Sequence, residues 1–389
     1  MPRKRPLIST PFSKQRAFSA TRRRFLQGSA AALAGVTLSN CRQNLAEVQT
    51  GTDSTNASAA GGGAGGTGTL NIYTWADYVD DELTARFTEE TGIRAVVDIY
   101  DSNETMLAKL QAGGGNAYSI LYPSDYMVAQ MLEMDLLTEL DQSRIKGKEN
   151  LLDQWTDPVY DPGNAHSVPY SWGTTGLLYN RELVTGSVED WSYLWDNKES
   201  LSRRITLLDD VRETMGAVLK SLGYSYNSTD PQQLEEAYQR LLEIKPHLAA
   251  FRSFGFEEQL LGGDLSVVMS YSVDAIAATL EDERMEYIVP ASGSSVWTDA
   301  MVIPADAPNA DAAYAWINFI LQPEISKDAV ERLSFATPNG AAFDLLPDEL
   351  KSNQDLFPTD ATLAKCEGIA PLGDVADLYD RYWTEVTSS

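Results

Sequence analysis

From residue 70 onward, apolar and polar positions along the chain alternate between strand periodicity and helix periodicity. Residues 70–75 (LNIYTW) are rich in β-forming side chains, and residues 80–91 have the spacing of an amphipathic helix. Gly92 stands directly after that helix, where a left-handed residue ends many helices. The same pattern predicts strands over 93–100 and 118–122, and a helix from the capping-box variant Asp101-x-x-Glu104 through Gln111. This strand–helix alternation predicts an α/β fold on a parallel, doubly wound sheet.

The ends of the predicted strands carry aromatic and acidic side chains. Ligands of open parallel sheets collect at the carboxyl ends of the strands, and the loops there include residues 75–78 (WADY) and 123–126 (PSDY). Four later strands are predicted, over 175–179, 205–208, 265–271 and 300–303. Aromatic residues and carboxylates flank these strands as well. We therefore expect a ligand site made from loops that are far apart in the sequence.

The amino-terminal residues differ in composition from the rest of the chain. Residues 1–40 hold eight Lys and Arg and no acid, and include Thr21-Arg22-Arg23-Arg24-Phe25-Leu26-Gln27 before a short apolar stretch. Paired arginines ahead of such a stretch predict a twin-arginine export signal rather than a membrane span. Residues 38–41 (LSNC) resemble a lipobox in which Asn40 is unusual. Lipidation of Cys41 and its absence are therefore both open.

A low-complexity segment and a strong negative charge follow. Residues 41–67 are rich in Gly, Ser, Thr and Ala and predict a flexible linker. Gly63-x-Gly65-x-x-Gly68 matches a dinucleotide-binding pattern but precedes the first strand instead of following one, so we reject it. The net charge is −26 for the whole chain and −34 without residues 1–40. So acidic a protein repels nucleic acid and anionic lipid and attracts cations.

The few cysteines and histidines limit the chemistry that the chain can perform. Cys41 and Cys366 cannot build a disulfide framework, and His166 and His247 belong to no HExxH or similarly spaced motif. We expect no metal site, no cofactor and no nucleophilic triad. About 320 ordered residues are too many for one hydrophobic core, so two domains are expected.

Carboxylates recur beside aromatic side chains in the predicted loops. The groups are Trp75/Asp77/Tyr78, Tyr271/Asp274 and Trp297/Asp299, with Asp210/Glu213 as a further acidic pair that also fits a capping box. A carboxylate offers charge-assisted hydrogen bonds to an organic ammonium. An aromatic face adds about 0.5–2 kcal/mol of cation–π attraction. The pattern therefore predicts a binding site for an organic cation.

Long segments distributed over the chain match one known family in the same order. They are IYTWADYV, YDSNETMLAKL, YPSDY, VPYSWGTTGLLYN, LLDDVRETM, LGYSYNSTDP, VWTDAMVIPADA and ATPNGAA. Through them the chain, from about residue 70 to its carboxyl end, resembles the periplasmic spermidine/putrescine-binding proteins of ABC importers. The resemblance implies a two-lobe periplasmic-binding-protein fold, each lobe a mostly parallel sheet flanked by helices, with the ligand cleft between the lobes. We expect lobe 1 to comprise 68–176 and 298–336, and lobe 2 to comprise 177–297 and 337–389.

The family's ligand contacts can be carried over to single positions of this chain. Its aromatic contacts match Trp75, Tyr78, Tyr126 and Trp297, its amine-binding acids match Asp210, Glu213 and Asp299, and a polar contact matches Ser124. Tyr271 stands where many members have tryptophan, and Phe335 where a tyrosine is usual. The family's amine-contacting glutamine is not evident near Leu372. Asp77 and Asp274 resemble putrescine binders, whereas Trp297 resembles spermidine binders. All these residues except Leu372 make up the predicted site.

The resemblance implies a monomeric receptor, without catalytic activity, that captures polyamines and delivers them to an ABC permease in the cytoplasmic membrane. The acids outnumber the two charges of a diamine, which favours spermidine over putrescine. Alternatives are a binding protein for another ligand, such as another cation, ferric iron or a sugar, and a secreted hydrolase with paired carboxylates. A hydrolase leaves unexplained why each acid accompanies an aromatic residue. The expected location is the periplasm, with or without an anchor through Cys41.

Overall fold

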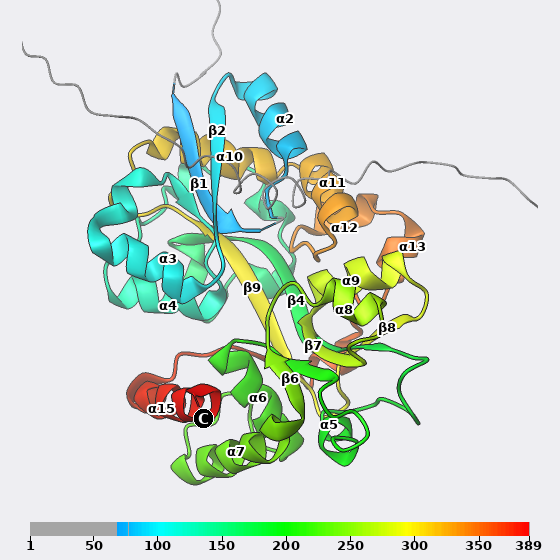
Figure 1. Cartoon of the computed structure of the whole chain (residues 1–389). Coiled ribbons are helices and arrows are strands. Elements are labelled where there is room, and N and C mark those ends of the chain that lie inside the picture. The colour runs from blue at the N-terminus through cyan, green and yellow to red at the C-terminus, as the bar shows by residue number, and fades with distance from the viewer. Residues whose placement is uncertain (1–67, 77, 389) are drawn as a thin grey trace, which may run out of the picture. The chain divides into compact units, whose positions relative to one another are not determined.

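The computed structural model describes residues 68–76 and 78–388 (Figure 1). The predicted signal peptide and linker, Cys41 and Asp77 lie outside the described residues. The strands are β1 (Thr69–Trp75), β2 (Arg94–Tyr100), β3 (Ile120–Leu121), β4 (Ser167–Asn180), β5 (Ile205–Leu207), β6 (Leu248–Phe251), β7 (Val267–Tyr271), β8 (Met285–Ile288), β9 (Ser295–Val302) and β10 (Glu367–Gly368). The α-helices are α2 (Asp81–Thr91), α3 (Asn103–Lys109), α4 (Asp125–Glu133), α5 (Ser192–Asp196), α6 (Val211–Ser221), α7 (Pro231–Ile244), α8 (Glu257–Leu261), α9 (Ser272–Glu281), α10 (Ala310–Ile320), α11 (Pro323–Leu333), α12 (Gly340–Leu345), α13 (Asp348–Lys351), α14 (Asp360–Leu363) and α15 (Ala376–Ser388).

The strands of the described residues form one mixed sheet. Its order is β2-β1-β3-β9-β4-β7-β5-β6, with β8 paired to β4 and β10 paired to β9. At one end β1 pairs in parallel with β2 and β3, and at the other end β5 pairs in parallel with β6 and β7. In the middle, β4 and β9 are antiparallel to each other and to their outer neighbours β7 and β3. Parallel pairing is therefore present at both ends, and two antiparallel strands join the ends.

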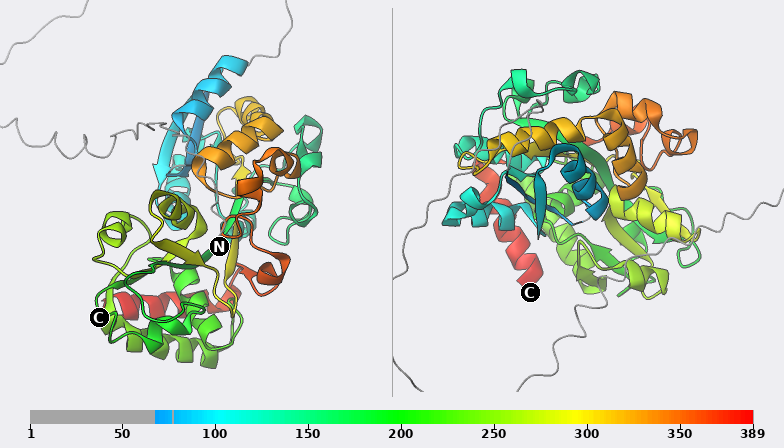
Figure 2. Two further views of the ribbon diagram at one scale, coloured as in Figure 1. Left: turned by 90° about the vertical axis from the view of Figure 1, so that its right-hand side faces the viewer. Right: turned by 90° about the horizontal axis from the view of Figure 1, so that it is seen from above.

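Two large hydrophobic cores pack around the two ends of this sheet. The first core includes Leu70, Phe87 and Trp316 from β1, α2 and α10. The second core includes Leu219 and Tyr379 from α6 and α15. Figures 1 and 2 show the corresponding helices grouped apart, with α2 and α10 near β1 and β2, and α6, α7 and α15 together in the part of the molecule that contains β6. No helix in the described part of the chain has the length and apolar character needed to cross a membrane.

Strand β4 is longer than the sequence predicted, because it extends over 14 residues that are all buried. A strand was predicted only over 175–179, since Pro169 and the glycines interrupt the β-forming pattern. Gly173 is required here by close packing: a Cβ at this position would lie 2.3 Å from the ring of Trp297. Backbone approach of this kind is a reason for glycine inside a strand.

Strand β9 also differs from its prediction. It begins at Ser295 instead of at residue 300, so Trp297 and Asp299 lie inside the strand and not in a loop ahead of it. Residue 299 is opposite Ser171 of β4 and also forms an isolated bridge with Ser124. Asp299 is therefore held by backbone pairing on both sides, whereas Trp297 pairs with Gly173 of β4.

The helix ends confirm one predicted cap and correct another. Asp80 caps α2 by accepting a hydrogen bond from the Leu83 N–H, and Gly92 ends the helix with φ 72°. Helix α3 is capped by Ser102, whose side chain accepts from the Thr105 N–H, and not by the predicted Asp101. The prediction was wrong because both residues fit an N-cap. The side chain of Glu104 is thus not part of a capping box.

Candidate ligand-binding site

Asp299 is a buried acid within β9. Its carboxylate accepts hydrogen bonds from the Tyr78 hydroxyl and, at 2.7 Å, from the Ser124 hydroxyl. The residue is 4% exposed. Burial raises the pKa of Asp299 to about 6, while these two hydrogen bonds act in the opposite direction. Because both donors are neutral hydroxyls, the ionised carboxylate keeps its charge for a cation.

Aromatic rings surround the Tyr78 side of this carboxylate. The Tyr78 ring lies 5.5 Å from Phe335 and 5.8 Å from Tyr170, measured between centroids. Trp75 packs edge-on against Tyr100 at 4.6 Å, and its indole N–H donates to the Tyr122 carbonyl. Phe335 stands where a tyrosine was expected, and its 2% exposed ring packs on Tyr78. The tyrosine hydroxyl that the family usually has at this position is therefore absent, and the Phe335 ring offers only apolar contact.

A chain of hydrogen bonds leads from Asp299 through Ser124 to a second acid. The Asn103 amide nitrogen lies 3.1 Å from Ser124 Oγ and 3.0 Å from the Tyr126 hydroxyl. The Tyr126 hydroxyl donates to Glu104 Oε1 at 3.0 Å. Burial raises the pKa of Glu104, and the charge of Asp210 raises it further. Glu104 is therefore affected by the charge of Asp210 at the start of α6.

Asp210 and Glu213 stand at the amino end of α6. Asp210 caps the helix through a 3.0 Å hydrogen bond from the Glu213 N–H, and it accepts from the Tyr271 hydroxyl at 3.3 Å. The Glu213 carboxylate accepts from Tyr226 at 2.6 Å and from Ser295 at 2.8 Å. Burial raises the pKa of Glu213 to about 7, with a further contribution from Asp210. Only half of the predicted capping box is present, because the buried Glu213 side chain bonds hydroxyls instead of the Asp210 backbone.

Tyr271 and Trp297 form the aromatic part of the site on the α6 side. Their rings meet edge to face, with centroids 6.1 Å apart and planes at 89°. The Trp297 side chain is buried, and its indole N–H has no acceptor among the described residues. Asp274 lies in the first turn of α9, shortly after Tyr271. Contact of Asp274 with a ligand stays a prediction, as does that of Asp77, which lies outside the described residues.

Sequence reasoning missed several residues that join these parts. Asp125, at the start of α4, is 4% exposed, and burial raises its pKa well above the usual value. The charges of Asp299 and Glu213 act on it in the same direction, whereas Arg212 lowers the pKa. The Arg212 guanidinium lies 6.0 Å from the centroid of the Tyr126 ring. Glu104 was visible in the sequence but was interpreted as a cap. Asp125 belongs to the 123–126 loop that the sequence indicated, but it was not named as a site residue, and nothing marked Arg212 as different from a surface charge.

The assembled site suits an organic cation better than a metal. No group of three or more His, Cys, Asp or Glu side chains in the described residues could hold a metal ion. Three of the predicted acids, Asp210, Glu213 and Asp299, instead come from the start of α6 and from β9, and each accepts a hydrogen bond from a hydroxyl group. A separate cavity of about 300 Å³, lined by residues such as Gln142, Leu151 and Asn164, includes none of the predicted site residues.

Known proteins with similar sequences and structures provide an independent comparison. The spermidine/putrescine-binding periplasmic protein of Salmonella typhimurium is 34% identical over 319 residues, which are 82% of this chain and 91% of that protein. The putrescine-binding periplasmic protein SpuD of Pseudomonas aeruginosa is 31% identical over 337 residues, with 82% and 92% covered. The crystal structure of PotD, the substrate-binding protein of a spermidine/putrescine ABC transporter from Streptococcus pneumoniae, superimposes with a TM-score of 0.74 at 38% identity and covers 83% of this chain and 99% of that one.

The structural match confirms the predicted α/β periplasmic-binding-protein fold. The model of the family described as bacterial extracellular solute-binding protein matches residues 82–359, which include most of the predicted site. The chain belongs to the bacterial extracellular solute-binding protein family.

Proposed function

We propose that the protein captures linear polyamines outside the cytoplasmic membrane and delivers them to an ABC import permease. The observation that carries the proposal is the buried Asp299 carboxylate, which two neutral hydroxyls hold close to aromatic rings. An ammonium group placed there would supply the positive charge that a buried carboxylate needs. The relatives named above, which bind spermidine and putrescine according to their names, support this class of ligand.

The proposed ligand pose combines charge and apolar contact. The terminal ammonium groups bind Asp299 at one end and Asp210 with Glu213 at the other, and the methylenes lie against Trp75, Tyr78, Tyr271 and Trp297. Burial of each CH₂ contributes about 0.8 kcal/mol. Putrescine's four methylenes then contribute roughly 3 kcal/mol and spermidine's seven roughly 5–6 kcal/mol.

We propose spermidine as the tighter ligand. Its extra apolar contact is useful only if the middle amine also meets a carboxylate, because an unpaired buried charge would remove the gain. The number of acids supports this preference: Glu104 adds to the predicted ones through its hydrogen bond from Tyr126 and its proximity to Asp210. Asp77 and Asp274 remain proposed contacts.

Isothermal titration calorimetry with putrescine, cadaverine, spermidine and spermine tests the proposal. Spermidine should bind with the lowest Kd and putrescine more weakly. Absence of heat with all four amines, together with binding of a sugar or of ferric iron, would overturn it. Chromogenic glycosides in a parallel assay test the hydrolase alternative, which requires release of the chromophore.

The protein's location and its two lobes belong to the same proposal. A twin-arginine signal would place the receptor in the periplasm, and Cys41 would anchor it if acylated. We propose that 68–176 with 298–336 and 177–297 with 337–389 move as two lobes about β4 and β9. The two hydrophobic cores support this division, because each collects most of its residues from one of the two sets.

A further inference from the structure

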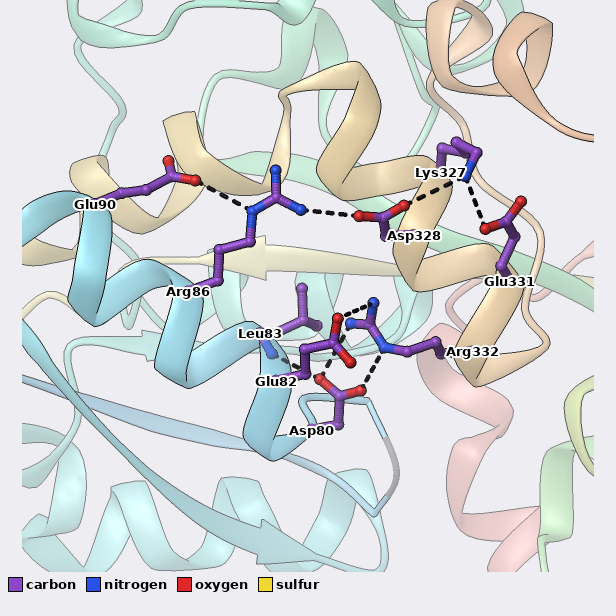
Figure 3. A network of polar contacts seen from close by, with 9 residues as sticks. All are labelled: Asp80, Glu82, Leu83, Arg86, Glu90, Lys327, Asp328, Glu331 and Arg332. Atoms are coloured by element: carbon purple, nitrogen blue, oxygen red, sulfur yellow. Dashed lines mark hydrogen bonds and ion pairs between the residues drawn. The ribbon is translucent and has the colours of Figure 1, made fainter. Parts of the chain in front are cut away.

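A network of charged side chains connects α2 to α11 (Figure 3). At one end of it, Arg332 binds Asp80 with two nitrogens: Nε lies 2.8 Å from Oδ2 and Nη2 lies 3.3 Å from Oδ1. The same Asp80 carboxylate caps α2 through the Leu83 N–H at 2.8 Å. Two parallel contacts from one guanidinium restrict orientation more than a single contact does. The pair therefore fixes the start of α2 relative to the end of α11.

Both partners of this pair stand beside residues of the ligand site. Asp80 follows Tyr78 by two positions, and Arg332 precedes Phe335 in the segment that leaves α11 through Ser334 at φ 63°. The Tyr78 and Phe335 rings are in contact, with centroids 5.5 Å apart. The ion pair and the ring contact thus join the same two backbone segments.

Tyr170 connects the ion pair to the position of Tyr78. The Tyr170 hydroxyl donates to the Tyr78 carbonyl at 2.6 Å, and the Tyr170 ring lies 5.0 Å from Phe335. The charges of Asp80 and Arg332 both act on the Tyr170 hydroxyl, with opposite sign, so the pair lies close to it. The Asp80 and Arg332 side chains are 28% and 24% exposed, whereas the rings are buried. The ion pair therefore lies nearer to the solvent than the three buried rings do.

We propose that the Asp80–Arg332 ion pair is a positioning element of the ligand site, which holds the 78–80 and 332–335 segments together and thereby directs the Tyr78 hydroxyl to Asp299. The proposal rests on the proposed polyamine function. Asp80 and Arg332 do not touch the ligand in this proposal. They act through Tyr78, whose hydroxyl donates to Asp299.

The same network contains a matched control. Arg86 joins the same two helices by a 2.8 Å contact to Asp328 and also binds Glu90 at 3.2 Å (Figure 3). Its partners lie inside α2 and α11, not in the segments that lead to Tyr78 or Phe335. Replacement of Arg86 therefore removes a comparable surface ion pair between the two helices. It leaves the segments next to Tyr78 and Phe335 held in place.

Loss of positioning should change how binding depends on pH. The hydrogen bond from Tyr78 opposes the rise in the pKa of Asp299, which burial brings to about 6. The other groups in electrostatic contact with Asp299 are Tyr100, Asp125 and Tyr160. None of these is altered when Arg332 is replaced. A weaker Tyr78 bond therefore raises the pKa of Asp299, and binding should be lost at a higher pH.

The experiment measures the spermidine Kd by calorimetry between pH 5.5 and 8.5 for the wild type and for Arg332→Met, Asp80→Asn and Arg86→Met. Asn preserves the N-cap of α2. We expect Arg332→Met and Asp80→Asn to bind about threefold to tenfold more weakly at pH 7, with the pH midpoint of binding moved upward. Arg86→Met should keep the wild-type Kd and midpoint, and thermal unfolding should show similar small decreases in Tm for Arg332→Met and Arg86→Met.

A double-mutant cycle with Tyr78→Phe separates positioning from a general loss of stability. If Arg332 acts through the Tyr78 hydroxyl, Arg332→Met should add little further loss to Tyr78→Phe. A wild-type Kd for Arg332→Met, or losses that add fully, would overturn the positioning role. A wild-type protein that binds none of the polyamines would overturn the proposed function itself, so the two failures are distinguishable.

Discussion

At the scale of single residues, the site acids share one arrangement. Asp299 receives hydrogen bonds from Tyr78 and Ser124, and Glu213 receives them from Tyr226 and Ser295. Hydroxyl donors stabilise a carboxylate but leave its negative charge in place. A Lys or Arg partner would instead neutralise that charge. Burial raises both pKa values, to about 6 and about 7. Each acid is therefore poorly solvated and gains when an ammonium arrives.

The first prediction compares a charge with an aromatic face. Asp299→Asn should weaken spermidine binding by at least about 30-fold, because it leaves an ammonium in the site without its partner. Trp297→Ala should weaken binding by less, since it removes cation–π and apolar contact only. Titration calorimetry measures both. Asp311→Asn serves as control, because Asp311 lies on α10 and forms an exposed ion pair with Arg144. Wild-type affinity in both site variants would mean that the site lies elsewhere.

The second prediction concerns pH. Unfolded Asp and Glu have pKa values near 4, so ligand-free folded protein retains protons on Asp299 and Glu213 that the unfolded chain has lost between about pH 4 and 7. The free energy of unfolding contributed by these groups therefore falls as the pH rises through that window. A bound polyamine stabilises the ionised carboxylates, because its ammonium groups pair with them. The decrease in the free energy of unfolding with rising pH is therefore smaller when the ligand is bound. The increase in Tm caused by saturating spermidine should thus be larger at pH 8 than at pH 5.

Differential scanning fluorimetry at the two pH values measures this difference. Glu213→Gln provides the matched variant, because its side chain can no longer titrate, and its ligand-induced shift should depend less on pH. Equal shifts at pH 5 and pH 8 in the wild type would contradict the assignment of these pKa values to the ligand site.

At the scale of elements, local patterns predicted α2, β1, β2 and β5 well, but neither the edge strand β6 nor the full length of the crossing strands. Gly92 ended α2 as predicted, because a left-handed glycine cap is a local signal. The length of β4 depends instead on pairing with β9 and β7, which are far away in the sequence. Pro169 also interrupts the β-forming pattern, so the first part of β4 was not predicted. Glu104 was found in the sequence but misassigned, because its contact with Tyr126 comes from another helix. Whether the predicted residues contact a ligand stays a prediction.

The third prediction tests the close approach of β4 to Trp297. Gly173→Ala places a Cβ where the Trp297 ring now lies, 2.3 Å away, so the ring has to move. We expect a loss of about 1–3 kcal/mol in the free energy of unfolding together with weaker spermidine binding. Gly115→Ala is the control, because a Cβ there meets nothing within 4 Å. Chemical denaturation and calorimetry report the two effects, and an unchanged Kd in Gly173→Ala would show that Trp297 is not held by this contact.

At the scale of the whole molecule, the sheet continues through both cores by way of β4 and β9. The acids that we assign to one ligand come from different parts of the fold: Asp299 from the middle strand β9, Glu104 from α3, and Asp210 and Glu213 from the start of α6. A ligand that binds all of them favours the arrangement in which they are close. Binding should therefore stabilise a closed state by mass action.

The fourth prediction follows from that coupling. Saturating spermidine should decrease the radius of gyration measured by small-angle X-ray scattering. Asp299→Asn at the same spermidine concentration should show little or no decrease, because its occupancy is lower. An unchanged radius of gyration in fully occupied wild-type protein would contradict closure of two lobes.

The way the two cores are assembled also has a consequence for biosynthesis. The first core joins Leu70 to Trp316, and the second core includes Val386. After the first 300 residues have been synthesised, both cores therefore still lack some of their residues. The first core has all its residues once Phe335 has emerged, whereas the second core needs Val386 of the last helix. The second half therefore folds stably only after synthesis has ended. An export machinery that accepts chains already folded suits such a protein, since the ribosome has finished before there is a native structure to carry.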